Sequence, residues 1–258
     1  MTEILVKDVM SKPVTIAKSA PLTEALAKML REGVDPLIAV HNNTVTGTVS
    51  RRSIAEKLGS KKTRNIAPTS IHVANVSNDD FTIVYEDQGI DVLIALMQAG
   101  AKLAVVYDSD NNLIGQVTYG DLLSHLRPTS PLREALEEPH LMDAGERVVH
   151  LRRVMMDGNI SHFVVMKDHA AVGIVSETDV SVAMKKFRES VPEKHQDAQV
   201  RNLIVEGIMT SPVITLDLSV GLDSVIDTLL EKRISGIPIT DSGKIIGMVT
   251  RKSAIMAL

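Results

Sequence analysis

A seven-residue pattern occurs four times in this chain of 258 residues. It reads Gly, any residue, Val, Ser or Thr, any two residues, and then Asp or Ser. From average residue usage, the pattern is expected by chance at roughly one position in ten thousand. Four occurrences therefore indicate an internal repeat, which constrains the fold more than any other feature. The copies are Gly47–Ser53, Gly115–Asp121, Gly173–Asp179 and Gly247–Ser253.

The spacing of the copies gives the size of the repeating unit. The first Gly of each copy lies at position 47, 115, 173 or 247, so the period is roughly 60 to 75 residues. That period is too long for a solenoid unit and fits a small subdomain. The predicted repeats are residues 1–62, 66–127, 128–190 and 199–258.

Each repeat is predicted to contain a strand, a helix, two further strands and a last helix. In the first repeat, Pro21 lies at a helix start, and Gly33 ends the helix. Between them, apolar residues follow the helical period. Two short apolar runs, 37–40 and 45–49, flank a turn and predict a hairpin, after which Ser50 begins the last helix. The predicted fold class is α/β (α+β).

Composition limits the classes of function. Hydrophobic residues make up 44% of the chain but aromatic residues only 2%, so the core must be aliphatic. The absence of Cys excludes disulfides, thiolate catalysis and Cys-ligated metal. A net charge of −4 argues against a dominant nucleic-acid surface. With no signal-peptide pattern and no apolar run of about 18 residues, we expect a cytoplasmic protein without a membrane span.

No catalytic constellation is recognisable in the sequence. The eight His residues are scattered, without a His-x-x-x-His or His-x-Glu pair, so no metal site is predicted. No Ser-His-Asp arrangement and no glycine-rich phosphate loop is found. We therefore expect a protein that is not an enzyme and requires no cofactor.

The repeated motif suits two different roles. Its Ser or Thr ends a strand and begins a helix, which places a hydroxyl and free N–H groups at a positive helix end that attracts phosphate. An Asp three residues later offers two oxygens to the cis-diol of a ribose. The alternative is a helix cap, because Ser/Thr-x-x-Asp is also an N-cap with an acidic third residue. The eight residues concerned are Ser50, Ser53, Thr118, Asp121, Ser176, Asp179, Thr250 and Ser253.

Three motifs together resemble the cystathionine-beta-synthase (CBS) domain. They are the opening Val9–Val14, the strand Gly236–Ile239, and the Gly-x-Val-[Ser/Thr]-x-x-Asp close. The resemblance covers nearly the whole chain in four copies, with no appended catalytic domain. This layout resembles the regulatory gamma subunit of AMP-activated kinase and stand-alone archaeal four-repeat proteins. It implies that two repeats form a pseudo-twofold module, so we expect modules at 1–127 and 128–258.

The resemblance also implies a non-catalytic sensor that binds AMP, ADP or ATP in clefts between repeats, and a regulated partner that responds to the bound state. Lys102 and His162 could meet phosphates there, and the alternative is that both are simply solvated loop residues. Arg51, Arg52, Arg251 and Lys252 are either further phosphate contacts or exposed helix-start charges. The implied pocket walls are formed by the openings and by residues before the middle strands: Val9, Val14, Val76, Phe81, Leu136, His140, Ile208 and Val213, with Asp35, Lys102, Ser161, His162, Ile234 and Ser235.

Several alternatives stay open at this point. S-adenosylmethionine or its breakdown product offers the same adenosine contacts as a nucleotide. An enzyme and a nucleic-acid binder are the other classes, and the acidic charge and lack of an aromatic stacking platform weigh against the second. Either a monomer of two modules or a homodimer is compatible with the sequence. Because a carboxylate is the better ribose acceptor, we expect stronger sites at Asp121 and Asp179 than at Ser53 and Ser253.

Overall fold

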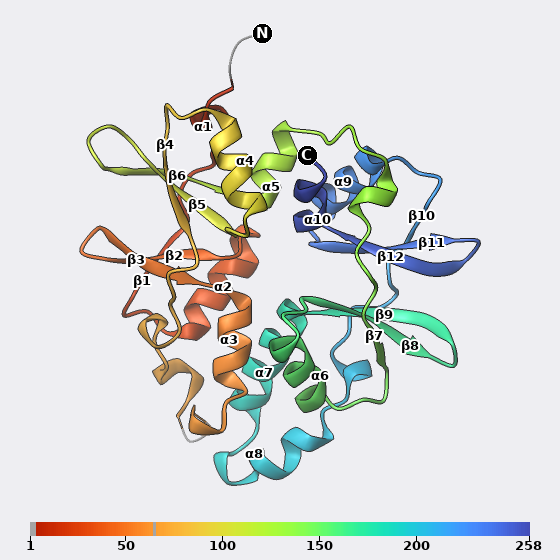
Figure 1. The fold of residues 1–258 in the computed structure, drawn as a ribbon. Coiled ribbons are helices and arrows are strands. Elements are labelled where there is room, and N and C mark those ends of the chain that lie inside the picture. Colours follow the sequence, from red (N-terminus) through yellow and green to blue (C-terminus); the bar gives the residue numbers. More distant parts are fainter. Residues whose placement is uncertain (1–3, 64–65) are drawn as a thin grey trace. The chain divides into compact units, whose positions relative to one another are not determined.

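Four three-stranded sheets form the framework of the repeats (Figure 1). The computed structural model describes residues 4–63 and 66–258. In every sheet the middle strand of the repeat lies at the centre, between the first strand and its antiparallel hairpin partner. The first strand runs parallel to the middle strand in repeats two, three and four. The predicted mixed α/β fold and the predicted order of elements are therefore confirmed.

The regular elements of repeats one and two follow the predicted order. Repeat one contains α1 (Val6–Val9), β1 (Thr15–Ala17), α2 (Leu22–Glu32), β2 (Leu37–His41), β3 (Thr44–Val49) and α3 (Arg51–Leu58). Short 3₁₀ turns at Lys61–Thr63, Pro68–Ser70 and Val73–Asn75 follow. Repeat two contains β4 (Thr82–Tyr85), α4 (Ile90–Gln98), β5 (Leu103–Tyr107), β6 (Leu113–Thr118) and α5 (Tyr119–His125).

The second half of the chain repeats this order. Its two repeats are joined by a long helix, α7 (Glu177–Ser190), and a further helix, α8 (Glu193–Gln199), where short turns join repeats one and two. Repeat three contains β7 (Leu141–Asp143), α6 (Val148–Asp157), β8 (His162–Lys167), β9 (Ala170–Ser176) and α7 (Glu177–Ser190). Helix α8 (Glu193–Gln199) lies in the polar stretch that connects to repeat four. Repeat four contains β10 (Leu216–Asp217), α9 (Leu222–Glu231), β11 (Gly236–Asp241), β12 (Lys244–Thr250) and α10 (Arg251–Met256).

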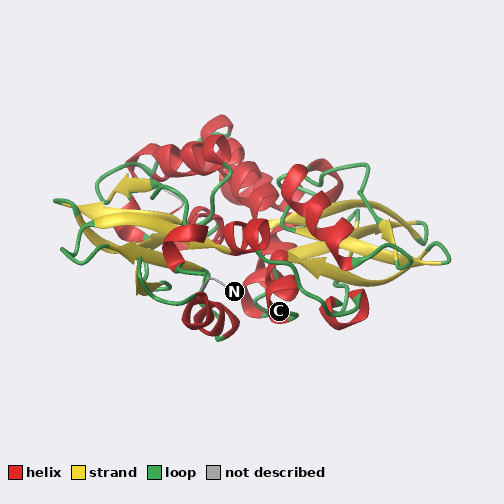
Figure 2. Cartoon of the chain, turned by 90° about the horizontal axis from the view of Figure 1, so that it is seen from above, coloured by secondary structure: helices red, strands yellow, loops and turns green. Residues whose placement is uncertain are grey.

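The chain divides into two compact units that are not continuous in sequence. The first unit comprises 1–15, 79–138 and 214–258, and so contains the sheets of repeats two and four. The second unit comprises 16–78 and 139–213, and so contains the sheets of repeats one and three. Helices lie beside the strands of the sheets (Figure 2). In the first unit α5 contacts β6 and α10 contacts β12, and in the second unit α7 contacts β9.

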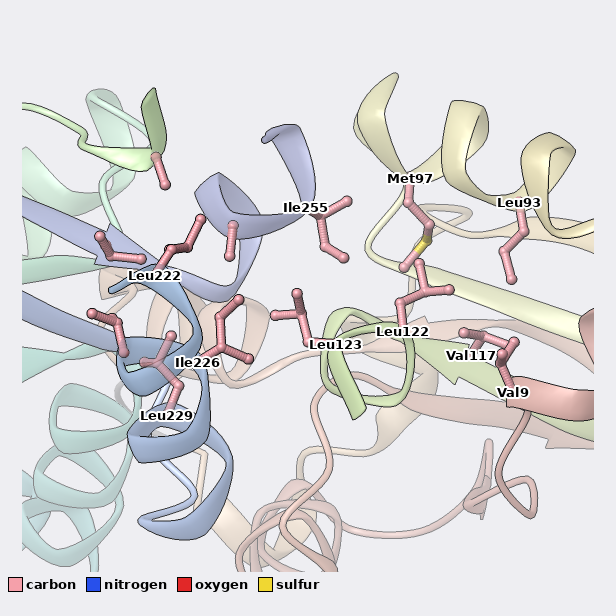
Figure 3. Close-up of a cluster of buried hydrophobic side chains, with 14 of the residues drawn as sticks. Val9, Leu93, Met97, Val117, Leu122, Leu123, Leu222, Ile226, Leu229 and Ile255 are labelled. Atoms are coloured by element: carbon pink, nitrogen blue, oxygen red, sulfur yellow. The ribbon is translucent and has the colours of Figure 1, made fainter. Parts of the chain in front are cut away.

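An aliphatic core joins repeats two and four within the first unit. The last helix of repeat two, α5, contributes two adjacent buried leucines to it. Leu122 faces Met97 of α4, whereas Leu123 lies toward Ile226 of α9 and Ile255 of α10 (Figure 3). Because all these side chains are fully buried, one short helix connects the apolar faces of two repeats. The expected aliphatic core is thus found.

The second unit contains the equivalent core of repeats one and three. The predicted stripe of α2 is buried at Leu22, Leu26 and Met29. Helices α3 and α7 pack against one another, and α7 also contacts α2. The Arg188 side chain of α7 is buried and donates to the carbonyl oxygens of Leu58, Thr63 and Ile66. These carbonyls belong to the segment that leaves α3, so α7 also fixes the end of repeat one.

The segment that precedes the first strand of each repeat, here called its opening, pairs with the sheet of the neighbouring repeat, so the openings are exchanged between consecutive repeats. The opening of repeat one pairs with repeat two through Ser11 and Gln116, and that of repeat two pairs with repeat one through Asn78 and Thr48. The same exchange joins repeats three and four, through the bridges Glu137–Met248 and Thr210–Ile174. This reciprocity supports the expected modules 1–127 and 128–258. The modules remain a prediction, because each compact unit contains one repeat from each module.

No helix in residues 4–63 and 66–258 is long and apolar enough to cross a membrane. Within the same residues, no group of three or more His, Cys, Asp or Glu side chains is arranged to hold a metal ion.

Candidate functional site

All four motifs cap a helix, as expected if the motif is an N-cap. The Ser50 hydroxyl accepts from the Ser53 N–H over 3.1 Å, and the Ser53 hydroxyl accepts from the Ser50 N–H over 3.1 Å. Thr250 and Ser253 make the same reciprocal pair over 3.0 and 2.9 Å. Both pairs satisfy N–H groups that the helix leaves free. Serine at the third position is therefore a competent cap without a carboxylate.

The two motifs with Asp are capped differently. Oδ2 of Asp121 accepts from the Thr118 N–H over 2.7 Å and from the Thr118 hydroxyl over 2.6 Å. Oδ2 of Asp179 accepts from the Ser176 N–H over 2.8 Å and from the Ser176 hydroxyl over 2.6 Å. In both motifs one carboxylate oxygen thus completes the cap, which leaves the second oxygen for another partner.

The second oxygen distinguishes the two repeats. Oδ1 of Asp179 accepts a hydrogen bond from the Thr210 hydroxyl over 3.1 Å. Oδ1 of Asp121 has no hydrogen-bond partner among residues 4–63 and 66–258. Since both carboxylates are only partly buried, the oxygen of Asp121 is the one open to an added donor.

The opening segment that covers each helix start comes from the partner repeat of the exchange. Gly115 is closed over by Met10, whose sulfur lies 2.5 Å from where a Cβ on that Gly would be. Met209 lies equally close to Gly173, at 2.6 Å. The repeated Gly therefore does allow a close approach to the backbone, and the approaching group is the exchanged opening. The opening Val9–Val14, which contains Met10, was identified from the sequence. No pattern in the sequence indicated that it would cover the motif of another repeat.

The expected wall residues divide between the two units. Val9 is fully buried against the core of the first unit, whereas Val14 is only half-buried beside β6 of repeat two. In repeat four, the side chain of Leu136 lies against Gly247. Phe81 and Ile234 also belong to the first unit, whereas Val76, His140, Ile208 and Val213 belong to the second.

The turn before the middle strand contacts the helix start of its own repeat. The Asp35 carboxylate accepts from the Arg51 N–H over 3.0 Å. The corresponding bonds in repeats three and four run from the Glu177 N–H to the Ser161 carbonyl and from the Arg251 N–H to the Ser235 carbonyl. Lys102, in repeat two, is 42% exposed and forms an ion pair with Asp80 at 3.8 Å. These expected residues therefore lie next to the motif.

His162 does not have the properties of a phosphate-binding cation. Its imidazole is 7% exposed, and Nδ1 lies 2.8 Å from the Ser161 hydroxyl. Burial lowers the pKa of His162 to about 4, because removal from water disfavours the charged ring. The imidazole is therefore neutral at pH 7, so a contact of His162 with phosphate, which stays a prediction, would be a neutral hydrogen bond. The His140 ring packs against Phe163, with ring centroids 5.8 Å apart and the two planes tilted by 48°.

Three of the four motif cations are engaged by the protein. Arg51 donates to the Thr178 hydroxyl over 3.2 Å and to the Met29 carbonyl over 3.1 Å. Arg52 forms a largely buried ion pair with Glu177 at 2.9 Å. Arg251 donates to the Leu229 carbonyl over 3.0 Å, and Lys252 is exposed. The two arginines of repeat one hold neighbouring helices together and are part-buried, so they are not exposed helix-start charges, and their contact with phosphate stays a prediction.

Two further residues beside the motifs were not identified from the sequence. The Glu137 carboxylate, from the opening of repeat three, accepts from the Thr250 hydroxyl over 3.0 Å. This places an acceptor with negative charge at the helix start of repeat four. Gln116, in β6, is fully buried, and its Oε1 accepts from the Val14 N–H over 2.8 Å. Neither position belongs to the fixed letters of the motif, so no pattern pointed to them.

Comparison with known proteins agrees with this geometry. The sequence profile described as "CBS domain" matches residues 6–60, 73–128 and 205–258, which is more than half of the chain. Two proteins of Methanocaldococcus jannaschii, MJ1404 and MJ1225, are each 22% identical to it. The alignments span 97% and 95% of this chain, but 61% of MJ1404 and 94% of MJ1225.

Solved structures show the same fold over nearly the full length. The crystal structure of MJ1225, described as a proposed archaeal homolog of g-AMPK, has a TM-score of 0.80 at 21% identity and covers 98% of this chain and 99% of that chain. An uncharacterised conserved protein from Pyrococcus horikoshii has a TM-score of 0.62 at 19% identity, with 98% of both chains covered. Together with the profile match, the four exchanged repeats and their capped Ser/Thr motifs show that this chain belongs to the CBS domain family.

Proposed function

We propose that the protein is a non-catalytic regulatory sensor that binds adenosine-containing nucleotides at the helix starts of its repeats. One observation carries the proposal: Asp121 holds the Thr118 cap with Oδ2 alone and keeps Oδ1 without a partner in the described chain. A carboxylate oxygen beside a helix start is a strong acceptor for a ribose hydroxyl. CBS-domain proteins without a catalytic domain act as regulatory ligand sensors, which agrees with this assignment.

The four clefts are proposed to differ in affinity. Repeat two has the open carboxylate oxygen, whereas in repeat three Thr210 already donates to Oδ1 of Asp179. Repeat one offers only the Ser53 hydroxyl, which is engaged in the cap. In repeat four the Thr250 hydroxyl donates its hydrogen bond to the Glu137 carboxylate, whose negative charge repels an added phosphate. The proposed order is therefore repeat two, then repeat three, then repeats one and four.

Calorimetric titration of AMP, ADP and ATP into the wild type and Asp121→Ala tests the proposal. A hydrogen bond to a charged group contributes about 1.5–3 kcal/mol, so the variant should lose tenfold or more in affinity at the strongest site. Asp179→Ala is the matched control, because it removes the same cap in repeat three and should leave the strongest site intact. S-adenosylmethionine in parallel distinguishes nucleotides from other adenosine ligands. Equal affinity of the double variant and the wild type would reduce both Asp residues to helix caps.

The pairing of repeats is part of the same proposal. Exchange of openings between repeats one and two, and between three and four, supports modules at 1–127 and 128–258. Limited proteolysis of the full chain should then cut near Arg127–Pro131 or near Glu189–Gln199. A stable fragment containing repeats two and three alone would contradict the pairing.

A further inference from the structure

Two buried polar atoms beside Thr118 lack partners. Gln116 directly precedes Val117 in β6, and Tyr119 directly follows Thr118 at the start of α5. Nε2 of Gln116 and the hydroxyl of Tyr119 are buried, and neither makes a hydrogen bond in the described part of the chain. Buried donors without partners are rare in native proteins and call for an explanation. Both occupy variable positions within the motif of repeat two, whose Asp121 keeps an open oxygen.

The orientation of the Gln116 amide is fixed by its surroundings. Oε1 accepts from the Val14 N–H over 2.8 Å. If the amide were inverted, its NH₂ group would face the Val14 N–H and two donors would oppose each other. The orientation of the Gln116 amide therefore leaves its Nε2 as a free donor for a further partner.

The position of Gln116 places this donor at the proposed cleft of repeat two. Side chains two residues apart on a strand lie on the same face, so Gln116 shares a face of β6 with Thr118. Ser11, in the exchanged opening, pairs with the Gln116 backbone in both directions over 2.9 and 3.0 Å. Val14, which the amide holds, is an expected wall residue of the cleft. The amide thus lies between the motif and the opening that covers it.

The other repeats lack this group. The same motif position is Thr48 in repeat one, Ile174 in repeat three and Met248 in repeat four. The Thr48 hydroxyl already donates to Oδ1 of Asn78 over 3.0 Å. Ile174 and Met248 have no side-chain hydrogen-bond donor. A free amide donor at this position is thus particular to repeat two.

We infer that Gln116 is a specificity-determining residue of the repeat-two cleft, where its Nε2–H donates to a ring-nitrogen acceptor of a purine base. This inference rests on the proposed function and deepens it. Asp121 accepts from the ribose, and a nucleoside held there extends its base along β6 toward Gln116. Nε2 is covered in the free protein, so binding includes a small shift of Lys12–Val14, which has no regular secondary structure.

The test pairs protein variants with ligand analogues. AMP and its 1-deaza, 3-deaza and 7-deaza analogues are titrated into the wild type, Gln116→Met and Gln116→Glu. Gln116→Met copies the residue that repeat four uses at this position, and Gln116→Glu keeps an acceptor for the Val14 N–H but removes the donor. Ile174→Val, at the equivalent position of repeat three, is the control for packing changes.

In the wild type, one deaza analogue should bind about five- to tenfold more weakly than AMP, as expected for one lost hydrogen bond. That difference should vanish in Gln116→Met and persist in Ile174→Val, as in a double-mutant cycle. As a readout without any substitution, the side-chain NH₂ resonances of Gln116 should shift in NMR spectra when AMP is added.

The outcomes separate the two proposals. If AMP binds the wild type but all analogues bind alike, or if discrimination survives in Gln116→Met, the role of Gln116 is overturned and the nucleotide-binding proposal stands. An unchanged Gln116 NH₂ signal at saturating AMP also overturns that role. If no adenosine nucleotide binds the wild type, the proposed function fails and the inference fails with it.

Discussion

The Thr210 hydroxyl lies 3.1 Å from Oδ1 of Asp179 and donates a hydrogen bond to it. Thr210 comes from the opening of repeat four, whereas Asp179 belongs to the motif of repeat three. The equivalent residue in the opening of repeat one is Ser11, whose hydroxyl is directed to the Gln116 carbonyl at 3.4 Å and leaves Asp121 open. Two motifs of identical pattern thus present different acceptors, because different openings cover them.

Thr210→Val should strengthen nucleotide binding at repeat three. The substitution keeps the shape of the side chain but removes the donor, so Oδ1 of Asp179 becomes available to a ribose hydroxyl. We expect a gain of about three- to tenfold at that site, equivalent to the release of one hydrogen bond. Calorimetry in an Asp121→Ala background isolates repeat three. Ser11→Ala, in the opening that covers repeat two, is the control. An equal gain in affinity at repeat three from this variant would show that the freed oxygen of Asp179 does not cause the gain.

Arg52→Ala should destabilise the protein far more than removal of an exposed arginine. Arg52 pairs with Glu177 at 2.9 Å, and the two side chains are only 16% and 18% exposed. It also donates to the carbonyls of Met155 and Met156. Its loss leaves a largely buried carboxylate and two carbonyls without a donor, which costs about 3 kcal/mol.

Arg31→Ala is the matched control for that measurement by urea denaturation. Arg31 pairs with Glu32 at 3.0 Å, but the two side chains are 66% and 41% exposed. An exposed pair contributes less than about 1 kcal/mol. If both variants lose the same free energy of unfolding, burial does not determine how much the Arg52–Glu177 pair stabilises the protein.

The stability of the protein should depend on the protonation of His162 under acidic conditions. The unfolded chain binds a proton with a pKa near 6.5, whereas the buried imidazole has a pKa of about 4. Between these values the unfolded state binds more protons, so stability decreases as the pH falls from about 6.5 to about 4. The full contribution is roughly 3 kcal/mol.

Denaturation of the wild type and His162→Phe at pH 7 and pH 4.5 measures this contribution. The variant lacks the titrating group, so it should lose less stability on acidification than the wild type. His195→Gln, at an exposed position in α8, controls for the removal of any His. Parallel pH profiles of the wild type and His162→Phe would be incompatible with a buried neutral His162.

Gly47→Ala should be more destabilising than Gly207→Ala. Gly47 has φ +141°, and a Cβ there would lie 2.6 Å from the Asn78 carbonyl oxygen of the exchanged opening. Both the backbone strain and the contact with rigid backbone oppose an Ala at this position. A Cβ on Gly207 meets nothing within 4 Å. Thermal denaturation compares the two, and equal losses would mean that the opening yields freely at Gly47.

The sequence alone determined the repeats, their order of elements and the residues that start each last helix. These features are local: a strand of apolar residues, a hydroxyl cap and a helical stripe depend on neighbours within a few residues. Ser50, Thr118, Ser176 and Thr250 all cap helices as predicted. The third position after the cap was also predicted to separate strong acceptors from weak ones, which remains to be measured.

Only the tertiary structure decided which opening covers which motif, and therefore which acceptors are open. Thr210 on Asp179, Glu137 on Thr250 and Val14 on Gln116 join residues 31, 113 and 102 positions apart. No local pattern encodes such contacts, because they arise when an opening segment packs on the sheet of another repeat. His162 is likewise buried and neutral, although the sequence offered it as a candidate phosphate contact. Burial and long-range hydrogen bonds thus decide which acceptors beside each motif stay open.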